Sequence, residues 1–353
     1  MGAYRWAYNR TIQQKELEYR DTGKSGSYLK SRKLWIELFR KEAEWLKDIP
    51  AHTIYGAMMD ADKDYSSVIK KRSKGLPTDL PRCRRRTQKT FYILGNAITE
   101  KGIYPRLLGL LKSKEKLPNK PRDSRILLEN DKWYLLVPED VECKPTENQS
   151  RIASVDPGIK TFATVFSQTE LTKLGQGLFG RLQRLAYYLD DLLSRASKAN
   201  KRRQKRMYLA AGRMRTKISN LVKDLHYQVI GYLFRNFDTV IFPEGDFTSA
   251  CSKAKRKLRR KSVRNLLTFS FAKFRDRLIS KAQLLGKRVV IVNEAYTSKT
   301  ANWTGEIVRN LGGRSKITSN NITLDRDVNG ALGIFLKALV DHPVGNYGNV
   351  NKN

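Results

Sequence analysis

The fold is decided by the stretch RIASVDPGIKTFATVFS, residues 151–167, in which two apolar, β-branched runs are joined by Pro-Gly. Helical patterns follow from about residue 178 to 236. Two more buried-strand runs come next, TVIF at 239–242 and RVVIVN at 288–293, and the helix-like segment LLTFSFAKFRDRLISKAQLLG separates them. Strand, helix and strand at this spacing predict an α/β layer with a parallel pair of strands.

Acidic residues stand where these strand-like runs end. Asp156 closes the first run, Glu244 follows TVIFP, and Glu294 ends the run that begins RVVIVN. Asp325 and Asp327 precede the last helical pattern, NGALGIFLKAL. Acids at the carboxyl ends of parallel strands meet at one edge of a sheet, where carboxylates can bridge two Mg²⁺ ions roughly 4 Å apart. The pattern indicates metal-dependent cleavage of a phosphodiester, although such acids are also ordinary turn residues or helix caps.

The charge of the chain points to an acidic partner. The 353 residues carry 69 Lys or Arg against 34 Asp or Glu, a formal net charge of +35 at pH 7. Because 40% of the residues are hydrophobic and 10% aromatic, this charge sits on a folded protein and not on a disordered tail. The balance argues against a small-molecule enzyme and favours a nucleic acid over an anionic membrane, since the charge is spread along the whole chain and no amphipathic anchor stands out.

The cysteines and the apolar segments indicate the cellular compartment in which we expect the protein. Cys83, Cys143 and Cys251 are widely spaced, which gives neither a disulfide framework nor a metal-binding pair. No stretch approaches the roughly 20 apolar residues of a membrane span, and the start of the chain lacks the apolar region of a secretory signal. We therefore expect a soluble, intracellular protein with no membrane partner.

The N-terminal part of the chain divides into a helical and a β-like sequence pattern. Apolar residues at helical spacing predict a small helical bundle over residues 1–76. Short β-like runs, TFYILGNAI, RILLEN and WYLLVPEDV, predict a small barrel or sheet over 77–150. The string GKS near residue 24 does not form a phosphate-binding P-loop, because Glu18 stands where that motif needs glycine.

Three clusters of basic residues predict contacts to nucleic-acid phosphates. Residues 195–217 carry ten Lys or Arg and no acid, residues 253–264 carry eight in twelve positions, and RCRRR occupies 82–86. A helix face of this kind repels itself unless an anion lies against it; a nuclear-localisation tract or a solvated loop is the alternative. The candidate contacts are Arg84, Arg85, Arg86, Arg202, Arg203, Lys205, Arg206, Arg256, Lys257, Arg259 and Arg260.

We expect the histidines and several aromatic residues to have structural roles and not to bind metal or bases. His52, His226 and His342 neighbour none of the acids in sequence, so we expect surface or helix residues and not metal ligands. Aromatic residues at helical spacing are expected to lie mostly in the core and not to stack on bases. They are Tyr187, Tyr188, Phe269, Phe271 and Phe274.

Three segments, in this order and at these separations, resemble the RuvC-like nuclease of TnpB proteins, which insertion sequences encode, and of their eukaryotic and viral relatives called Fanzor. They are SVDPGIKTFATVF, EAYTSKT and LDRDVNGALGIF. The upstream strings YRWAYN and IPAHTIYGAMMDADKDY resemble the helical region that precedes that nuclease. The resemblance implies a multidomain α+β chain: a helical recognition segment at 1–76, a β-barrel wedge at 77–150, an RNase H-like (RuvC) nuclease at 151–340 with an insert at 297–324, and a flexible tail at 341–353.

The resemblance also implies site residues. Asp156 corresponds to the first metal-binding carboxylate and Asp327 to the third, with Asp325 the less favoured choice. Pro243 stands where TnpB proteins have the second acid, and Glu244 is one place late; a slip of one residue on a strand turns a side chain to the opposite face. In Fanzor proteins the acid lies before TSKT, where Glu294 stands. We expect Asp156, Glu294 and Asp327 to bind two Mg²⁺, or Mn²⁺, with Glu244 as the alternative second acid.

One departure from the family concerns zinc. Relatives carry a zinc ribbon of two CxxC pairs after TSKT, whereas Ala301, Thr304, Ile317 and Asn320 stand at the cysteine positions here. We expect no zinc, because no thiolate remains to bind it. The insert must then hold itself by packing around Trp303, or be mobile.

The function that the resemblance implies is RNA-guided cleavage of DNA by the product of a transposable element, with a guide RNA and target DNA as partners. The guide RNA is transcribed beside the gene, and the protein reads a short DNA motif. The alternative is a catalytically decayed TnpB-like protein that still binds RNA or DNA, or a regulator of transposition. The expected compartment is the nucleus in a eukaryotic or viral setting and the cytoplasm in a prokaryote.

Overall fold

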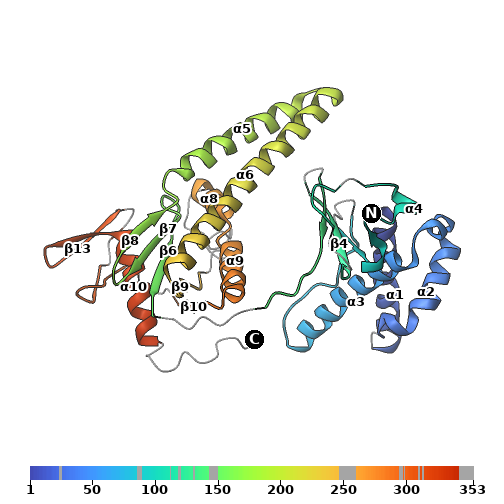
Figure 1. Ribbon diagram of the computed structural model, residues 1–353, viewed down its shortest axis with the longest axis horizontal. Coiled ribbons are helices and arrows are strands. Elements are labelled where there is room, and N and C mark those ends of the chain that lie inside the picture. Colours follow the sequence, from blue (N-terminus) through green and yellow to red (C-terminus); the bar gives the residue numbers. More distant parts are fainter. Residues whose placement is uncertain are drawn as a thin grey trace. The chain divides into compact units, whose positions relative to one another are not determined.

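The computed structural model divides the chain into two compact units, Met1–Asp140 and Val141–Asn353, drawn in Figure 1. The structure describes residues 1–23, 26–85, 90–111, 113–117, 121–129, 132–142, 150–245, 260–293, 297, 299–308, 311 and 314–341. Within these, only the backbone is described for residues 106–107, 260–262 and 265.

Helices fill the first half of the Met1–Asp140 unit, as the apolar spacing predicts. Gly23, with φ 66°, ends the first helix in the left-handed conformation that glycine adopts readily, and the Ser27 side chain accepts a hydrogen bond from Leu29 N at the start of the second. The bundle buries Phe39 and Ile54 completely. Its elements are α1 (Gly2–Thr22), α2 (Tyr28–Glu42), the 3₁₀ helix η1 (Glu44–Asp48) and α3 (Ala51–Ser73).

The second half of this unit contains short antiparallel strands. Three of them form a sheet in the order β1-β4-β5, and β2 pairs with β3. The pairings between described residues do not close a barrel, so the wedge barrel stays a prediction. The elements are β1 (Thr90–Ile93), η2 (Gly95–Ala97), β2 (Ile98–Thr99), β3 (Gly102–Ile103), α4 (Pro105–Leu108), β4 (Ser124–Glu129) and β5 (Lys132–Leu136).

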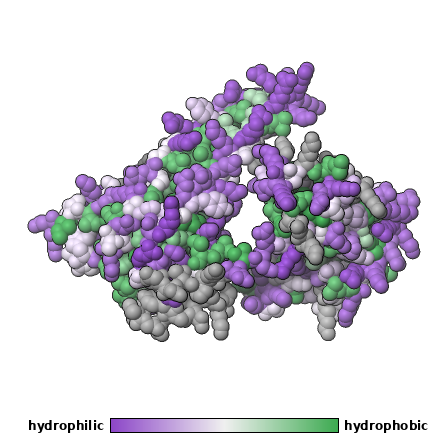
Figure 2. All heavy atoms as spheres, viewed as in Figure 1, coloured by the Kyte–Doolittle hydropathy of each residue, from purple (hydrophilic) through white to green (hydrophobic). Residues whose placement is uncertain are grey.

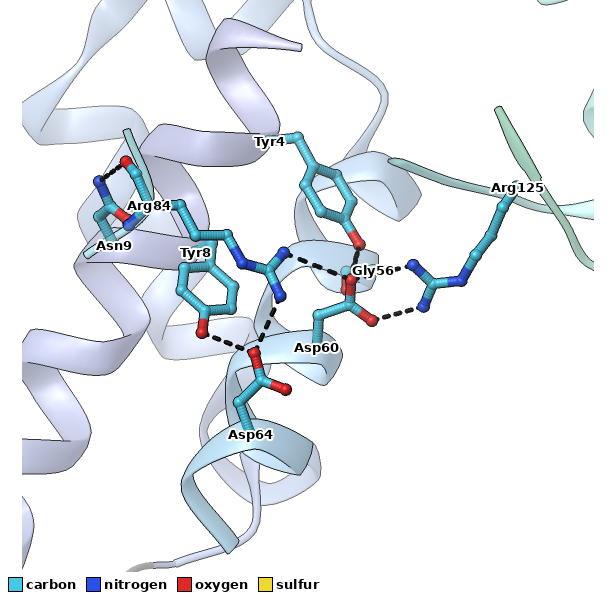
Figure 3. Close-up of polar contacts among 8 residues, drawn as sticks. All are labelled: Tyr4, Tyr8, Asn9, Gly56, Asp60, Asp64, Arg84 and Arg125. Carbon is cyan, nitrogen blue, oxygen red and sulfur yellow. Dashed lines mark hydrogen bonds and ion pairs between the residues drawn. The ribbon is translucent and has the colours of Figure 1, made fainter. Parts of the chain in front are cut away.

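A carboxylate on α3 ties the helices to the sheet (Figure 3). Asp60 accepts a hydrogen bond of 2.7 Å from the Tyr4 hydroxyl on α1, and both its oxygens accept from the guanidinium of Arg125 on β4. Burial raises the pKa of Asp60, but the hydrogen bonds from Arg125 and Tyr4 outweigh it and hold this pKa below its usual range. The ionised form of Asp60 therefore stabilises the folded unit.

We expect Asp60→Ala to lower the free energy of unfolding of this unit by about 2 kcal/mol, because it leaves Arg125 and the Tyr4 hydroxyl without their partner. Since the folded pKa of Asp60 is lowered, its contribution is present above about pH 4 and is lost as pH falls through the folded value. Urea unfolding followed by tryptophan fluorescence measures the change, because four of the five tryptophans lie before residue 141.

Asp79→Ala is the matched control, since Asp79 pairs with Arg82 at side-chain exposures of 84% and 87%. An exposed pair of this kind contributes little, so the control should stay within about 0.5 kcal/mol of the parent chain. Equal effects of the two substitutions on the free energy of unfolding would show that Asp60 contributes no more to stability than an exposed ion pair does.

A five-stranded sheet forms the centre of the Val141–Asn353 unit, in the order β10-β9-β6-β7-β8. The two pairs β6–β9 and β9–β10 are parallel, and β6–β7 and β7–β8 are antiparallel. The parallel pair predicted from the sequence is thus confirmed. The strands are β6 (Ile152–Pro157), β7 (Ala163–Ser167), β8 (Leu171–Leu174), β9 (Thr239–Pro243) and β10 (Arg288–Val292).

Helices cover both faces of this sheet. Val240 and Phe242 on β9 pack into the core shared with α6, α8 and α9, whereas Ile241 packs with Ile334 and Phe335 of α10. Alternate residues of β9 therefore point to opposite helix layers. The helices are α5 (Leu178–Lys198), α6 (Lys201–Asn236), α8 (Arg260–Phe269), α9 (Phe271–Leu284) and α10 (Arg326–Asp341).

The insert before α10 folds around its own apolar cluster. Two hairpins form it, β11 (Thr300–Ala301) with β12 (Glu306–Ile307), and β13 (Lys316–Ser319) with β14 (Ile322–Asp325). Ala301 and Ile317, at two of the expected cysteine positions, are fully buried and pack against Trp303. The prediction that the segment packs around Trp303 is confirmed.

The other two expected cysteine positions are also accommodated without a thiolate. Thr304 Oγ1 lies 3.0 Å from Ser319 Oγ, and Asn320 turns the second hairpin at φ 47°. Asparagine adopts this left-handed conformation more readily than most residues. The side chains present are those of a turn and a packed core.

Candidate active site

Asp156 is placed by β6 against α10. Ser154, two residues earlier on the same face of the strand, donates a hydrogen bond of 2.7 Å to the Ala331 carbonyl of α10. At the neighbouring helix position, a Cβ added to Gly330 would lie 2.4 Å from Asp156 Oδ2. The Asp156 carboxylate therefore fills the space that the absent Gly330 side chain leaves.

Asp327 lies in the first turn of α10, on the same face of the helix as Gly330. It precedes Gly330 by three residues, and side chains at this spacing are neighbours, with Cβ atoms about 5–6 Å apart. Because the Asp156 carboxylate lies against Gly330, we expect Asp327 to lie near it, at the carboxyl end of β6. The start of a helix favours an acidic side chain, since its partial charge is positive.

Asp325 has a different task. Its Oδ1 accepts a hydrogen bond of 2.9 Å from Asp327 N and a longer one of 3.4 Å from Val328 N, which caps the start of α10, and its Oδ2 pairs with Lys173 at 2.7 Å. Burial raises the pKa of Asp325, but the Lys173 ammonium and the backbone donors outweigh it and lower this pKa overall. These contacts occupy both oxygens and fit the preference for Asp327.

The two candidates for the second acid differ in strand face. Ile241 faces α10, so alternation places Pro243, and not Glu244, on the Asp156 side of β9. Glu244 is exposed, and its backbone N–H donates to Val292 O at 2.8 Å. On β10, Val290 and Val292 pack on the α10 side. Glu294, two positions further, lies outside the described residues.

The donors in this site are carboxylate oxygens, the ligands that Mg²⁺ and Mn²⁺ prefer. Among the described residues there is no group of three or more His, Cys, Asp or Glu side chains arranged to hold a metal ion. Asp156 and Asp327 supply two donors.

A pair of asparagines fastens the loop after Glu294 to α10. Asn329 is fully buried; its Oδ1 accepts from Asn302 N at 3.0 Å and its amide donates to Thr300 O at 2.7 Å. Asn302 returns a hydrogen bond of 2.7 Å to the Asn329 carbonyl, and a Cβ on Gly333 would lie 2.6 Å from Asn302 Nδ2. The sequence did not lead us to predict these hydrogen bonds. Gly333, a glycine inside a helix, where glycine is costly, is the signal of close approach that points to these hydrogen bonds.

Comparison with known proteins shows what the chain is similar to. Residues 271–334 match the family model "Cas12f1-like, TNB domain". Over 229 residues the chain is 28% identical to TnpB-like protein L79 of Acanthamoeba polyphaga mimivirus, covering 60% of this chain and 43% of that protein. These matches show that the chain is similar to TnpB-like proteins, and they support a TnpB-family protein.

Two further matches show how much of the chain resembles known proteins. A putative transposase of Paramecium bursaria Chlorella virus 1, A625R, is 28% identical over 246 residues, covering 67% of this chain and 55% of that one. The chain spans about half the length of the curated relatives it matches. A solved structure, the Cas12f1-sgRNA-target DNA complex, aligns with 94% of this chain and 80% of the Cas12f1 chain, at a TM-score of 0.56 and 13% identity. That likeness concerns the fold alone.

The longest basic stretch lies on an extended helical hairpin. In Figure 1, α5 and α6 run side by side away from the sheet, and the space-filling view in Figure 2 shows hydrophilic side chains gathered over their far end. Buried residues of α6 lie mainly from Val222 onward, whereas the first half of the helix is largely exposed. The exposed cations predicted from the sequence here are Arg202, Arg203, Lys205 and Arg206.

The RCRRR cluster is more divided. Arg84 stacks on the Tyr8 ring at 3.6 Å, pairs with Asp64 at 2.9 Å, and has its backbone held by Asn9, so its charge is used within the protein (Figure 3). Arg85 is exposed. Arg86, Arg256, Lys257 and Arg259 lie outside the described residues, as do Cys143, Cys251 and His342, and of Arg260 only the backbone is described.

The aromatic residues separate into two groups. Phe269, Phe271 and Phe274 are buried, as predicted. The same expectation is wrong for Tyr187 and Tyr188, which are 55% and 63% exposed on α5. None of the described helices combines the length and the apolar character that crossing a membrane requires.

Proposed function

We propose that the chain is an RNA-guided DNA endonuclease of a transposable element, which hydrolyses phosphodiester bonds at a RuvC-like site formed by Asp156, Glu294 and Asp327. The match to the Cas12f1-like family model, the similarity to TnpB-like proteins and the likeness in fold to Cas12f1 support a nuclease of transposon origin. The proposal of RNA and DNA as partners rests on the charge of the chain and on the Cas12f1 structure, a complex with sgRNA and target DNA.

The observation that carries this proposal is the contact between the Asp156 carboxylate and Gly330, one helical turn from Asp327. It supports the pairing of two acids that are 171 positions apart in the chain, at the end of a central strand. A structural role explains Asp325, whose oxygens cap and pair. Asp327 has no such cap to make within the described contacts, which leaves it available as a ligand.

Asp156, Glu294 and Asp327 would hold Mg²⁺ or Mn²⁺ through their carboxylate oxygens. When bound, a pair of these ions lowers the pKa of a bound water and offsets charge on the phosphodiester. The chain's own contribution is positional: Ser154 and Gly330 set the approach of β6 to α10, and Asp325 fixes the start of the helix that carries Asp327. Exposed cations on α6 would hold the nucleic-acid backbone.

The two glutamates give a matched test of the second acid. We expect Glu294→Gln to slow cleavage by about 10³-fold, because a neutral amide offers much weaker ligation than a carboxylate, and Glu244→Gln to leave the rate within about twofold. The assay uses the chain purified with the transcript encoded beside its gene, Mg²⁺, and a plasmid that carries the matching target. The opposite ranking of the two variants would transfer the role to Glu244.

A further inference from the structure

A pocket of ≈ 290 Å³ lies at the root of the hairpin formed by α5 and α6, where α8 and α9 pack against it. It is distinct from the edge where Asp156 meets α10, since that edge is on the other face of the sheet. The pocket is lined by five cations, Arg215, Lys223, Arg264, Lys273 and Arg277.

The positive charge of this pocket is largely uncompensated. Asp190 pairs with Arg264 and is not part of the lining. Within the part of the chain that the structure describes, Arg215, Lys223 and Lys273 form no ion pair with a carboxylate. Like charges gathered around one cavity repel each other, so binding of an anion there lowers the electrostatic free energy of the protein.

A buried histidine fixes one of these cations. His226 is fully buried; its Nε2–H donates to the Phe269 carbonyl at 2.8 Å, and its Nδ1 accepts from Arg277 Nη1 at 2.7 Å. Burial, against the opposing hydrogen bond to Phe269, lowers the pKa of His226 to about 4, so the ring is neutral at pH 7. It holds the Arg277 guanidinium without repelling it, and the remaining donors of Arg277 stay available.

Two more features suit a phosphate ester. Ser270 and Lys273, at the start of the 14-residue helix α9, line the pocket, and a helix N-terminus favours an anion. The lining also includes the apolar side chains of Leu189, Ile218 and Val222. A phosphate would lie among the cations with its sugar against these apolar side chains.

We propose that this pocket binds one backbone phosphate of the nucleic acid that lies along the basic half of α6. Arg215 belongs both to that basic stretch and to the pocket lining, so the two surfaces are continuous. The inference rests on the nucleic-acid binding in the proposed function, but not on its metal site. The same chemistry is offered by RNA and by DNA.

The test measures affinity of the full chain without Mg²⁺ for labelled single-stranded RNA, single-stranded DNA and an RNA–DNA duplex of one sequence. Ser219→Tyr places bulk at the pocket without changing charge, and Ser280→Tyr on the exposed side of α9 is its control. The double variant Lys273→Gln/Arg277→Gln removes two pocket charges. Its control is Arg314→Gln/Lys316→Gln, which removes two exposed charges from the same unit.

We expect both pocket variants to bind about tenfold more weakly than their controls. The charge variant should also reduce the slope of log affinity against log salt by about one phosphate contact. A loss confined to the RNA arm assigns the phosphate to RNA, a loss confined to the DNA arm assigns it to DNA, and a loss in every arm assigns it to the shared backbone.

The proposal is overturned if the pocket variants bind as tightly as their controls. If thermal melting shows that Ser219→Tyr unfolds, the charge variants alone decide. If the parent chain binds none of the three oligonucleotides, both this inference and the proposed function fail. If it binds all of them and the pocket variants are unaffected, only the pocket assignment is lost.

Discussion

Asp156→Ala is expected to reduce cleavage of a guide-matched plasmid by at least about 10³-fold. The Asp156 carboxylate lies at the end of the central strand β6 and against α10, where it would serve as a metal ligand. Metal ions contribute several kcal/mol of charge stabilisation to hydrolysis, and each 1.36 kcal/mol is a factor of ten in rate. Nicking of the plasmid in Mg²⁺ gives the rate, and a gel-shift assay shows whether RNA binding persists.

Asp341→Ala is the matched control for this substitution. Asp341 is exposed and ends α10, at the opposite end of the helix from Asp327, so the change removes the same charge far from the site. A variant at Asp156 that cuts as fast as this control would contradict the proposed site. If the parent chain binds RNA and cuts nothing, the alternative of a decayed TnpB-like binding protein is the correct one.

The strands and their acids could be predicted from the sequence because each signal is local. The β-branched runs predict β6, β9 and β10, and an acid at a strand end is visible in the string. The choice between Glu244 and Glu294 is not local, since it depends on which face of the sheet α10 covers. Only the packing of Ile241 and Val292 against α10 gives that face.

The contacts of charged residues, too, cannot be predicted from the local sequence. Nothing in RCRRR distinguishes Arg84 from Arg85, yet Arg84 is held by Asp64, which lies twenty residues earlier on α3. The insert behaves differently: the loss of its cysteines is visible in the string, and of the two expectations, packing around Trp303 or mobility, the structure shows the packing. Partners that are distant in sequence decide what a cation or a carboxylate does, whereas burial of apolar residues can be inferred position by position.

Gly330→Ala is the second large expected effect, and it separates the geometry of the site from the chemistry of its ligands. The added Cβ would lie 2.4 Å from Asp156 Oδ2, a distance that real Cβ atoms do not tolerate, so the carboxylate must move. We expect cleavage to fall by about 10²-fold, since a displacement of about 1 Å at a reacting group can cost this much. All three proposed ligands remain in the chain.

Stability should not fall in parallel. Alanine is favoured over glycine inside a helix by up to about 1 kcal/mol, and the atom displaced is the end of a side chain and not backbone. Gly231→Ala on α6 is the control, because an added Cβ there meets nothing within 4 Å; it gains the same helix stability and should cut normally.

The combination with Asp156→Ala gives the decisive comparison. If Gly330→Ala acts only by moving the Asp156 carboxylate, it should add no further loss of cleavage in the Asp156→Ala background, since two changes that act through one group are not additive. Thermal melting of each variant distinguishes loss of the site from loss of the fold. Normal cleavage by Gly330→Ala would mean that the carboxylate works from a position that α10 does not define, and the pairing of Asp156 with Asp327 across this contact would be wrong.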